Sequence, residues 1–243
     1  MKLFAIGDLH MPGGDDKPMD VFGDHWKDHV GQIFTNWREA VGEDDIVLIP
    51  GDLTWAMDLQ DAVPDLAAIG QLPGRKLICK GNHDYWWNTL AKVRAALPEG
   101  MEAVQHTAHD LGDVVVTGTR GWSFPTEEEP LSADEQKVFA RELIRLEIGL
   151  QAASKIAQGR PIVVMLHYPP LYMQQRDTAF TQLLEKYAVH TVVYGHLHGP
   201  ALHAGFTGEH GGVRYLLASS DSLHFAPKEI KVLRQKIKLY AEY

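Results

Sequence analysis

Short apolar runs rich in β-branched residues recur along this sequence, and helical patterns lie between several of them. Runs of this length are typical of strands that are buried on both faces of a sheet. The runs are Leu3–Ile6, Ile46–Ile49, Lys76–Cys79, Val114–Thr117, Ile162–Leu166, Thr191–Tyr194 and Val213–Leu217. The helical patterns are Asp20–Val41, Ala62–Ile69, Asn88–Leu97 and Ser132–Ala157. This alternation of strands and helices predicts an α/β layered fold.

Capping and turn residues refine the prediction. Ser132 and Glu135 have the spacing of a capping box, which predicts the start of the longest helix. The glycines of Phe206–Gly212 lead into Val213–Ser219, which predicts hairpins there and no further crossover helix. The charge run Glu127–Glu129 predicts a solvated loop.

Composition narrows the class of protein. A chain of 243 residues without a linker or repeat is predicted to form one domain over residues 1–243. The formal net charge of -9 disfavours binding to duplex nucleic acid or to membranes. The single cysteine, Cys79, cannot form an internal disulfide, and the N-terminus lacks the apolar core of a signal peptide. We therefore expect a cytoplasmic protein, and its 13 histidines suggest a metal site.

Five of the apolar runs are followed by side chains that can ligate metals. In open α/β sheets, ligands bind outside the carboxyl ends of the strands, so these side chains can meet in one crevice. They comprise two carboxylates, one amide and four imidazoles: Asp8, His10, Asp52, Asn82, His167, His196 and His198. Seven ligands exceed what one transition-metal ion takes, so the set predicts two ions that share a bridging carboxylate. Mixed oxygen and imidazole ligands favour manganese, with iron, zinc or cobalt as alternatives.

The order of these motifs resembles that of the calcineurin-like metallophosphoesterases. The matching segments, within roughly residues 1–200, are Asp8-x-His10, Gly51-Asp52, Gly81-Asn82-His83-Asp84, His167 and Gly195-His196-x-His198. The resemblance implies a two-sheet β-sandwich flanked by helices, with a binuclear centre at one edge. It also implies a first ion held by Asp8, His10 and His198, a bridge through Asp52, and a second ion completed by Asn82, His167 and His196.

The resemblance also implies catalytic residues. His83 would be the catalytic histidine near the leaving group, and Asp84 its orienting carboxylate. Asp84 has an alternative role as the N-cap of a helix that would begin at Tyr85. One departure from the family pattern is Trp55, which stands where many members have a second aspartate after Gly51-Asp52.

Further residues are candidates for substrate contacts. Arg120 and Arg176 are candidate phosphate ligands, because a guanidinium can bind phosphate through two hydrogen bonds. Aromatic residues that follow the motifs, among them Trp55, could line a wall for an apolar leaving group or base. The i, i+4 pair His25 and His29 predicts a solvated helix face and no ligand role.

These observations predict a binuclear metal-dependent phosphoesterase that uses a metal-bound hydroxide as nucleophile. We expect a small phosphorylated substrate, with a phosphodiester or nucleotide-like compound favoured. The alternatives are a phosphomonoesterase or protein phosphatase, a non-catalytic scaffold with the same fold, and a single-metal sensor. The complete ligand set together with His83 favours catalysis over the scaffold. Oligomeric state does not follow from the sequence.

Overall fold

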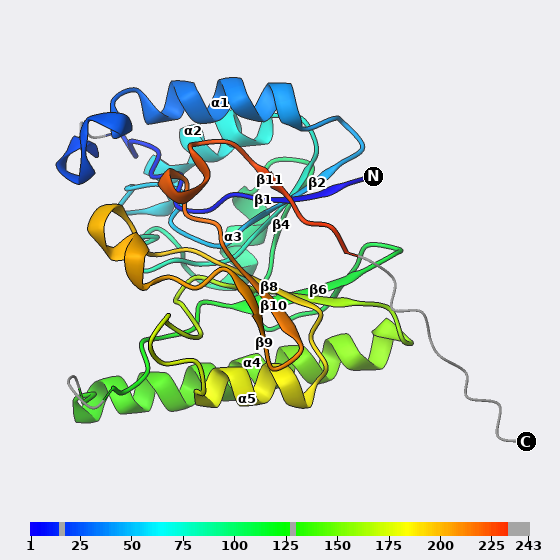
Figure 1. Cartoon of the computed structure of the whole chain (residues 1–243). Helices are drawn as coiled ribbons and strands as arrows, with labels where there is room; N and C mark the ends of the chain where they lie inside the picture. The colour runs from blue at the N-terminus through cyan, green and yellow to red at the C-terminus, as the bar shows by residue number, and fades with distance from the viewer. Residues whose placement is uncertain (15–17, 127–129, 233–243) are drawn as a thin grey trace, which may run out of the picture.

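Two β-sheets pack face to face in the computed structural model of this protein, and helices cover the outer side of each sheet (Figure 1). The structure describes residues 1–14, 18–126 and 130–232, so the predicted loop at Glu127–Glu129 lies outside the described residues. The arrangement confirms the predicted α/β layered sandwich. Within those ranges, no helix combines the length and the apolar character needed to cross a bilayer.

The first sheet has the strand order β11-β1-β2-β3-β4. Its strands β1 to β4 pair in parallel, and β11 joins the edge antiparallel to β1. Parallel strands of this kind need crossover connections, which the helices between them supply. The strands are β1 (Leu3–Ala5), β2 (Ile46–Ile49), β3 (Arg75–Ile78), β4 (Met101–Ala103) and β11 (Lys228–Glu229).

The second sheet has the order β5-β6-β7-β8-β10-β9. The four central strands are parallel, and an antiparallel strand closes each edge. The β9–β10 pair is the hairpin that the glycines near residue 210 predict. The strands are β5 (His109–Asp110), β6 (Val115–Thr119), β7 (Ile162–Leu166), β8 (Thr191–Tyr194), β9 (Gly208–His210) and β10 (Val213–Leu217).

Alternate residues of each strand enter different cores, because successive side chains of a strand point to opposite faces. In β2, Ile46 and Leu48 pack between the two sheets, whereas Val47 and Ile49 pack under the helices of the first sheet. In β7, Val163 packs between the sheets and Val164 packs under the helices of the second sheet. Both faces of both sheets are therefore buried, which explains the continuous apolar runs in the sequence.

Five α-helices are present in the described ranges, and side chains cap the starts of three of them, α2, α4 and α5. Ser132 and Glu135 form the predicted capping box of α4. Asp58 caps α2 by accepting the backbone N–H groups of Gln60 and Asp61. The helices are α1 (His29–Ala40), α2 (Leu59–Gly70), α3 (Leu90–Ala96), α4 (Ala133–Ala157) and α5 (Ala179–Lys186). In Figure 1, α1 and α2 cover the first sheet, and α4 and α5 cover the second.

Two predicted helices differ from the structure. The segment Asp20–Val41 begins as two 3₁₀ turns, because Gly23 and Asp28 have positive φ angles that interrupt an α-helix. The helix predicted to begin at Tyr85 begins instead at Leu90. The interpretation of Asp84 as its N-cap is therefore wrong. The short helix α5 and the edge strands β4, β5 and β11 have no counterpart among the predicted elements.

Candidate metal centre

The predicted ligands lie at one edge of the sandwich, where β1, β2 and β3 of the first sheet meet β7 and β8 of the second. Backbone hydrogen bonds join the loops at this edge. Asp8 N donates to Gly51 O at 2.9 Å, and His10 N donates to Asp52 O at 3.0 Å. Gly195 N donates to His167 O at 3.1 Å. The parallel topology thus places five separate strand ends in one crevice, as the sequence predicts.

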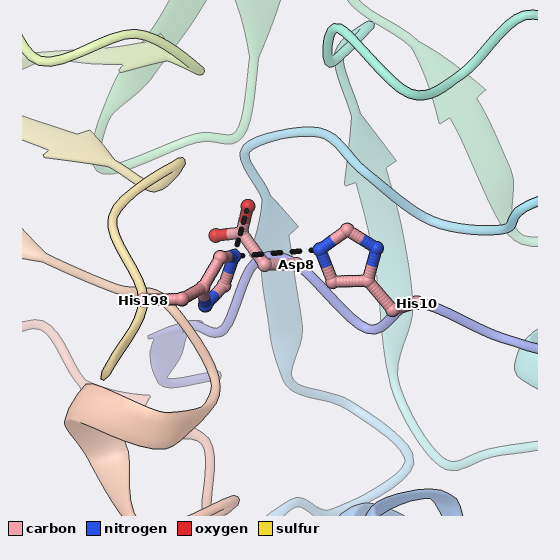
Figure 2. Close-up of side chains that lie close together, drawn as sticks. All are labelled: Asp8, His10 and His198. Atoms are coloured by element: carbon pink, nitrogen blue, oxygen red, sulfur yellow. Dashed lines mark hydrogen bonds and ion pairs between the residues drawn. The ribbon is translucent and has the colours of Figure 1, made fainter. Parts of the chain in front are cut away.

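The first group of side chains comprises Asp8, His10 and His198, all buried (Figure 2). His198 Nε2 lies 3.5 Å from Asp8 Oδ1 and 3.4 Å from His10 Nε2. In Figure 2, one ring nitrogen of His198 is joined by dashed lines to the Asp8 carboxylate and to the His10 ring. Two imidazoles and a carboxylate that converge in this way have the donor set of a transition-metal site.

The second group is centred on His167 and Asp52. His167 Nε2 lies 3.5 Å from Asp52 Oδ2 and 2.6 Å from Asn82 Oδ1. His196 Nδ1 lies 2.8 Å from the same Asn82 oxygen. Asp52 Oδ2 also lies 3.8 Å from His10 Nε2, in the first group. Asp52 therefore stands between the two groups, which is the position that a bridging ligand requires.

Four of the seven predicted ligands have strained backbones. Asp8, His10, Asp52 and His196 have φ angles of 56°, 44°, 52° and 76°. Such left-handed conformations cost of order 1–3 kcal/mol each for non-glycine residues and cluster at functional sites. Four such residues in one crevice agree with the predicted ligand role of these side chains.

Burial and neighbouring charges set the protonation states of the imidazoles. Burial lowers the pKa of His167 to about 3 and the pKa of His196 to about 4. Both rings are therefore neutral at pH 7, and their nitrogens can ligate a cation. Burial opposes charge on His198, but hydrogen bonds to Asp221 and Asp8 outweigh it and raise its pKa to about 10.

Positive charge nearby also decides whether the buried carboxylates of the crevice are ionised. Burial alone would raise the pKa of Asp8, yet its hydrogen bond with His198 and the charge of that ring lower it. Burial raises the pKa of Asp52 well above its ordinary range, and the charges of Asp84 and Asp8 add to this effect. Three buried carboxylates in one crevice are costly unless positive charge compensates them. The donor set therefore fits two divalent ions.

Hydrogen bonds behind the ligands orient the imidazoles. His167 Nδ1 lies 3.0 Å from Pro50 O, which leaves Nε2 to face the crevice. His198 Nδ1 lies 3.1 Å from Asp221 Oδ1, and Asp221 Oδ2 accepts Gly199 N–H at 2.9 Å. Such contacts fix the ring orientation and tautomer of a ligating histidine. Sequence reasoning missed Asp221, because no spacing relates it to a residue on a different strand.

The position of His29 differs from the one that the sequence predicts. It was predicted to lie on a solvated helix face, but it is half-buried at the start of α1. Its Nε2 lies 3.1 Å from His10 O, and its ring packs edge-on against Trp26 at 5.2 Å between centroids. His29 therefore supports the loop that carries His10. His25 is exposed, as predicted.

His83 and Asp84 lie beside the ligands in different environments. The backbone N–H of His83 donates to Asp52 Oδ1 at 2.8 Å, and the His83 ring lies 4.4 Å from the Trp55 ring. The Asp84 carboxylate is fully buried and accepts the backbone N–H groups of Gly81, Asp52 and Leu53 at 2.7–2.9 Å. It also accepts the indole N–H of Trp86 at 2.9 Å. Asp84 thus holds the two metal-site loops against each other.

Aromatic rings pack directly on the predicted ligands. Trp55 stacks on His10 at 4.7 Å with an interplanar angle of 24°. Tyr168 packs on His196 at 4.3 Å, and Trp26 lies edge-on to His198 at 5.3 Å. The tryptophan that replaces the second family aspartate therefore forms part of the wall of the crevice.

The two predicted arginines lie in different places. Arg120 is next to the crevice, since its backbone oxygen accepts the N–H groups of His167 and Tyr168 at 3.0 Å. Its guanidinium lies 4.6 Å from the Trp122 ring. Arg176 is exposed and stacks on Phe206 at 4.7 Å. None of its contacts in the described ranges is with a predicted metal ligand.

Comparisons with known proteins agree with this geometry. The sequence model of the calcineurin-like phosphoesterases matches residues 1–200. A search of curated proteins found no match.

Two solved structures resemble the whole chain. The phosphopantetheinyl hydrolase of Mycobacterium tuberculosis is 16% identical with a TM-score of 0.56, over 100% of this chain and 98% of that one. A protein of unknown function from Aquifex aeolicus, AQ665, is 14% identical with a TM-score of 0.49, over 94% and 95% of the two chains. At this identity the likeness to the hydrolase supports the fold alone. Because the family match spans most of the sequence and all the predicted strand-end ligands lie within it, this chain belongs to the calcineurin-like phosphoesterases and is a metal-dependent phosphoric ester hydrolase.

Proposed function

We propose that this protein hydrolyses a small phosphodiester or nucleotide-like ester at a centre of two divalent ions, with manganese favoured. The observation that carries the proposal is the convergence of seven predicted ligand side chains, Asp52 and six others around it, four of the seven with positive φ angles. Asp8, His10 and His198 would hold one ion, and Asn82, His167 and His196 the other. Two ions held there would activate water and neutralise the charge of a phosphate in line with it.

The chain's own residues supply the remaining functions. The backbone N–H of His83 donates to Asp52, and the His83 ring would hand a proton to the leaving oxygen. Trp55 packs against both His10 and His83, so an apolar leaving group would find an aromatic surface next to the proton donor. A phosphodiester carries a second organic group besides the leaving group, and the further rings at the crevice, Tyr168 on His196 and Trp26 on His198, would give that group a surface to pack on, which favours a diester over a monoester. Asp84 supports the reaction by fixing the Gly81 and Asp52 loops.

The test is a comparison of two chromogenic substrates. Metal-free protein is loaded separately with Mn²⁺, Fe²⁺, Zn²⁺ or Co²⁺ and assayed on bis(p-nitrophenyl) phosphate and on p-nitrophenyl phosphate. We expect the higher kcat/KM on the diester with Mn²⁺, and no turnover after chelation. Preference for the monoester would favour a phosphatase instead. Absence of turnover with every metal and substrate would favour the non-catalytic scaffold.

The similar solved structure suggests one more compound for the substrate assay. A phosphopantetheinyl ester is a natural test substrate, because the Mycobacterium tuberculosis protein of the same fold is a phosphopantetheinyl hydrolase. We also propose a cytoplasmic location, since Cys79 is a buried free thiol. The same proposal treats residues 1–243 as one domain.

A further inference from the structure

A second polar cavity lies beside the metal centre, and its walls carry one sign of charge. The cavity has a volume of about 240 Å³. Its lining includes four cationic side chains and no Asp or Glu: Lys80, Arg120, Arg141 and Arg145. Asn88 and Thr119 add neutral polar groups. In a chain with a net charge of -9, this concentration of positive charge stands out.

Strand order places this cavity directly next to the predicted ligands. The metal ligands follow β1, β2 and β3 in one sheet and β7 and β8 in the other. The cavity is lined from the ends of β3, β4 and β6, which continue the same edge in both sheets. Lys80 in the cavity and Asn82 at the metal centre are two residues apart, which is at most about 7 Å of extended chain. Arg120 lines the cavity, and its backbone oxygen accepts the backbone N–H of His167.

The cations of the cavity are incompletely neutralised. Arg145 pairs with the buried Glu142 at 2.6 Å. Within the described ranges, Lys80, Arg120 and Arg141 have no carboxylate at ion-pair distance. These groups repel one another, and an anion between them would relieve the repulsion.

The size of the cavity limits what it can hold. Pockets for whole ligands typically measure about 300–1,000 Å³, so this one suits a single small group. Arginine and lysine side chains around such a space suit a phosphate, because guanidinium groups bind it through paired hydrogen bonds.

We propose that this cavity binds a second phosphate of the substrate, held by Lys80, Arg120 and Arg141, while the scissile phosphate lies at the metal centre. The inference rests on the proposed function and narrows its substrate class to esters with a further phosphate a few bonds from the one cleaved. Arg120 would then contact the second phosphate and not the scissile one.

Kinetics on matched substrates test the proposal. The pair is a dinucleoside monophosphate and the same dinucleotide with a 5′-terminal phosphate, and bis(p-nitrophenyl) phosphate is the reference with one phosphate. Mn²⁺-loaded wild type should prefer the 5′-phosphorylated compound. In Arg141→Gln and Lys80→Gln its kcat/KM should fall by about 10- to 100-fold, as for a lost hydrogen bond between charged groups. The reference rate should stay unchanged. Lys137→Gln is the matched control, because Lys137 lies one turn before Arg141 on α4 and is exposed.

The outcomes separate the two proposals. Cleavage of bis(p-nitrophenyl) phosphate without any preference for the second phosphate would overturn the cavity proposal and leave the proposed function intact. If no substrate is cleaved, crystals of the Mn²⁺-loaded protein soaked in tungstate, a phosphate mimic, decide the matter. A tungsten anomalous peak among Lys80, Arg120 and Arg141 that disappears in Arg141→Gln supports the cavity. Tungsten at the metal centre alone, or at neither place, overturns it.

Discussion

Replacement of Asp221 by Asn tests whether His198 holds a metal ion. Asp221 Oδ1 lies 3.1 Å from His198 Nδ1, and Oδ2 accepts the backbone N–H of Gly199 at 2.9 Å. Asparagine keeps the shape of the side chain but has only one acceptor oxygen. Its amide nitrogen would therefore face one of the two donors, and either the His198 ring or the backbone after it must move.

The expected magnitude follows from the role of such partners. Loss of the group that orients a ligating histidine typically weakens metal binding by about 10- to 100-fold. Only one ion should be affected, because His167 of the other group is oriented by Pro50 O and not by Asp221. Titration of metal-free Asp221→Asn with Mn²⁺ in a calorimeter should thus show two sites, one with the wild-type Kd and one weakened within this range.

A matched control is available elsewhere in the chain. Asp177 Oδ1 lies 3.1 Å from His210 Nε2, which is the same kind of carboxylate–imidazole contact, but Asp177 is exposed. Asp177→Asn should bind both ions as wild type does. Two unchanged Mn²⁺ affinities in Asp221→Asn would refute the assignment of His198 as a ligand oriented by Asp221.

Three further changes give distinct signatures. His83→Ala should lower kcat by about 10²–10⁴-fold, the usual value for a general acid, and elemental analysis should find both metals retained; lost metal would argue for a ligand role. Gly81→Ala should lower metal content, because the added Cβ would overlap the Asp52 carboxylate, whereas Gly42→Ala has room and serves as control. Burial lowers the pKa of Lys76 to about 8, so the folded chain binds fewer protons than the unfolded chain between pH 8 and 10. The free energy of unfolding, measured in urea relative to Lys76→Met, should therefore rise over this range by up to about 2 kcal/mol; a flat difference would contradict the assignment.

The sequence predicts the strands better than it predicts what surrounds them. The apolar runs Ile46–Ile49 and Ile162–Leu166 form strands at the predicted bounds, because both faces of each sheet are buried and no polar residue interrupts the pattern. The helix predicted over Asp20–Val41 carries the correct apolar spacing, but local backbone angles divide it. The spacing of apolar residues predicts which side chains are buried, but it does not predict the backbone φ angles.

The same limit applies to the site. Asp8 and His198 could be predicted, because each lies within four residues after a strand and parallel strands end at a shared edge. Asp221 comes from a 3₁₀ turn after β10, and its contact with His198 depends on how that turn packs. Arg141 reaches the cationic cavity from the middle of α4, and its position depends on the angle at which α4 crosses the sheet. Contacts that depend on how helices, turns and strands pack together cannot be predicted from the spacing of residues within one segment.

The glycines of the motifs explain why the ligands at the strand ends could be predicted from the sequence. A Cβ on Gly81 would overlap the Asp52 carboxylate, and a Cβ on Gly195 would overlap the Asp8 carboxylate. Each carboxylate therefore occupies the space that a side chain on the neighbouring loop would take. The Asp8 carboxylate also accepts His196 N–H at 3.0 Å, and Asp52 accepts His83 N–H at 2.8 Å. A glycine on one loop thus leaves room for a ligand side chain on the neighbouring loop. That is why Gly occurs together with Asp, Asn or His where these strands end.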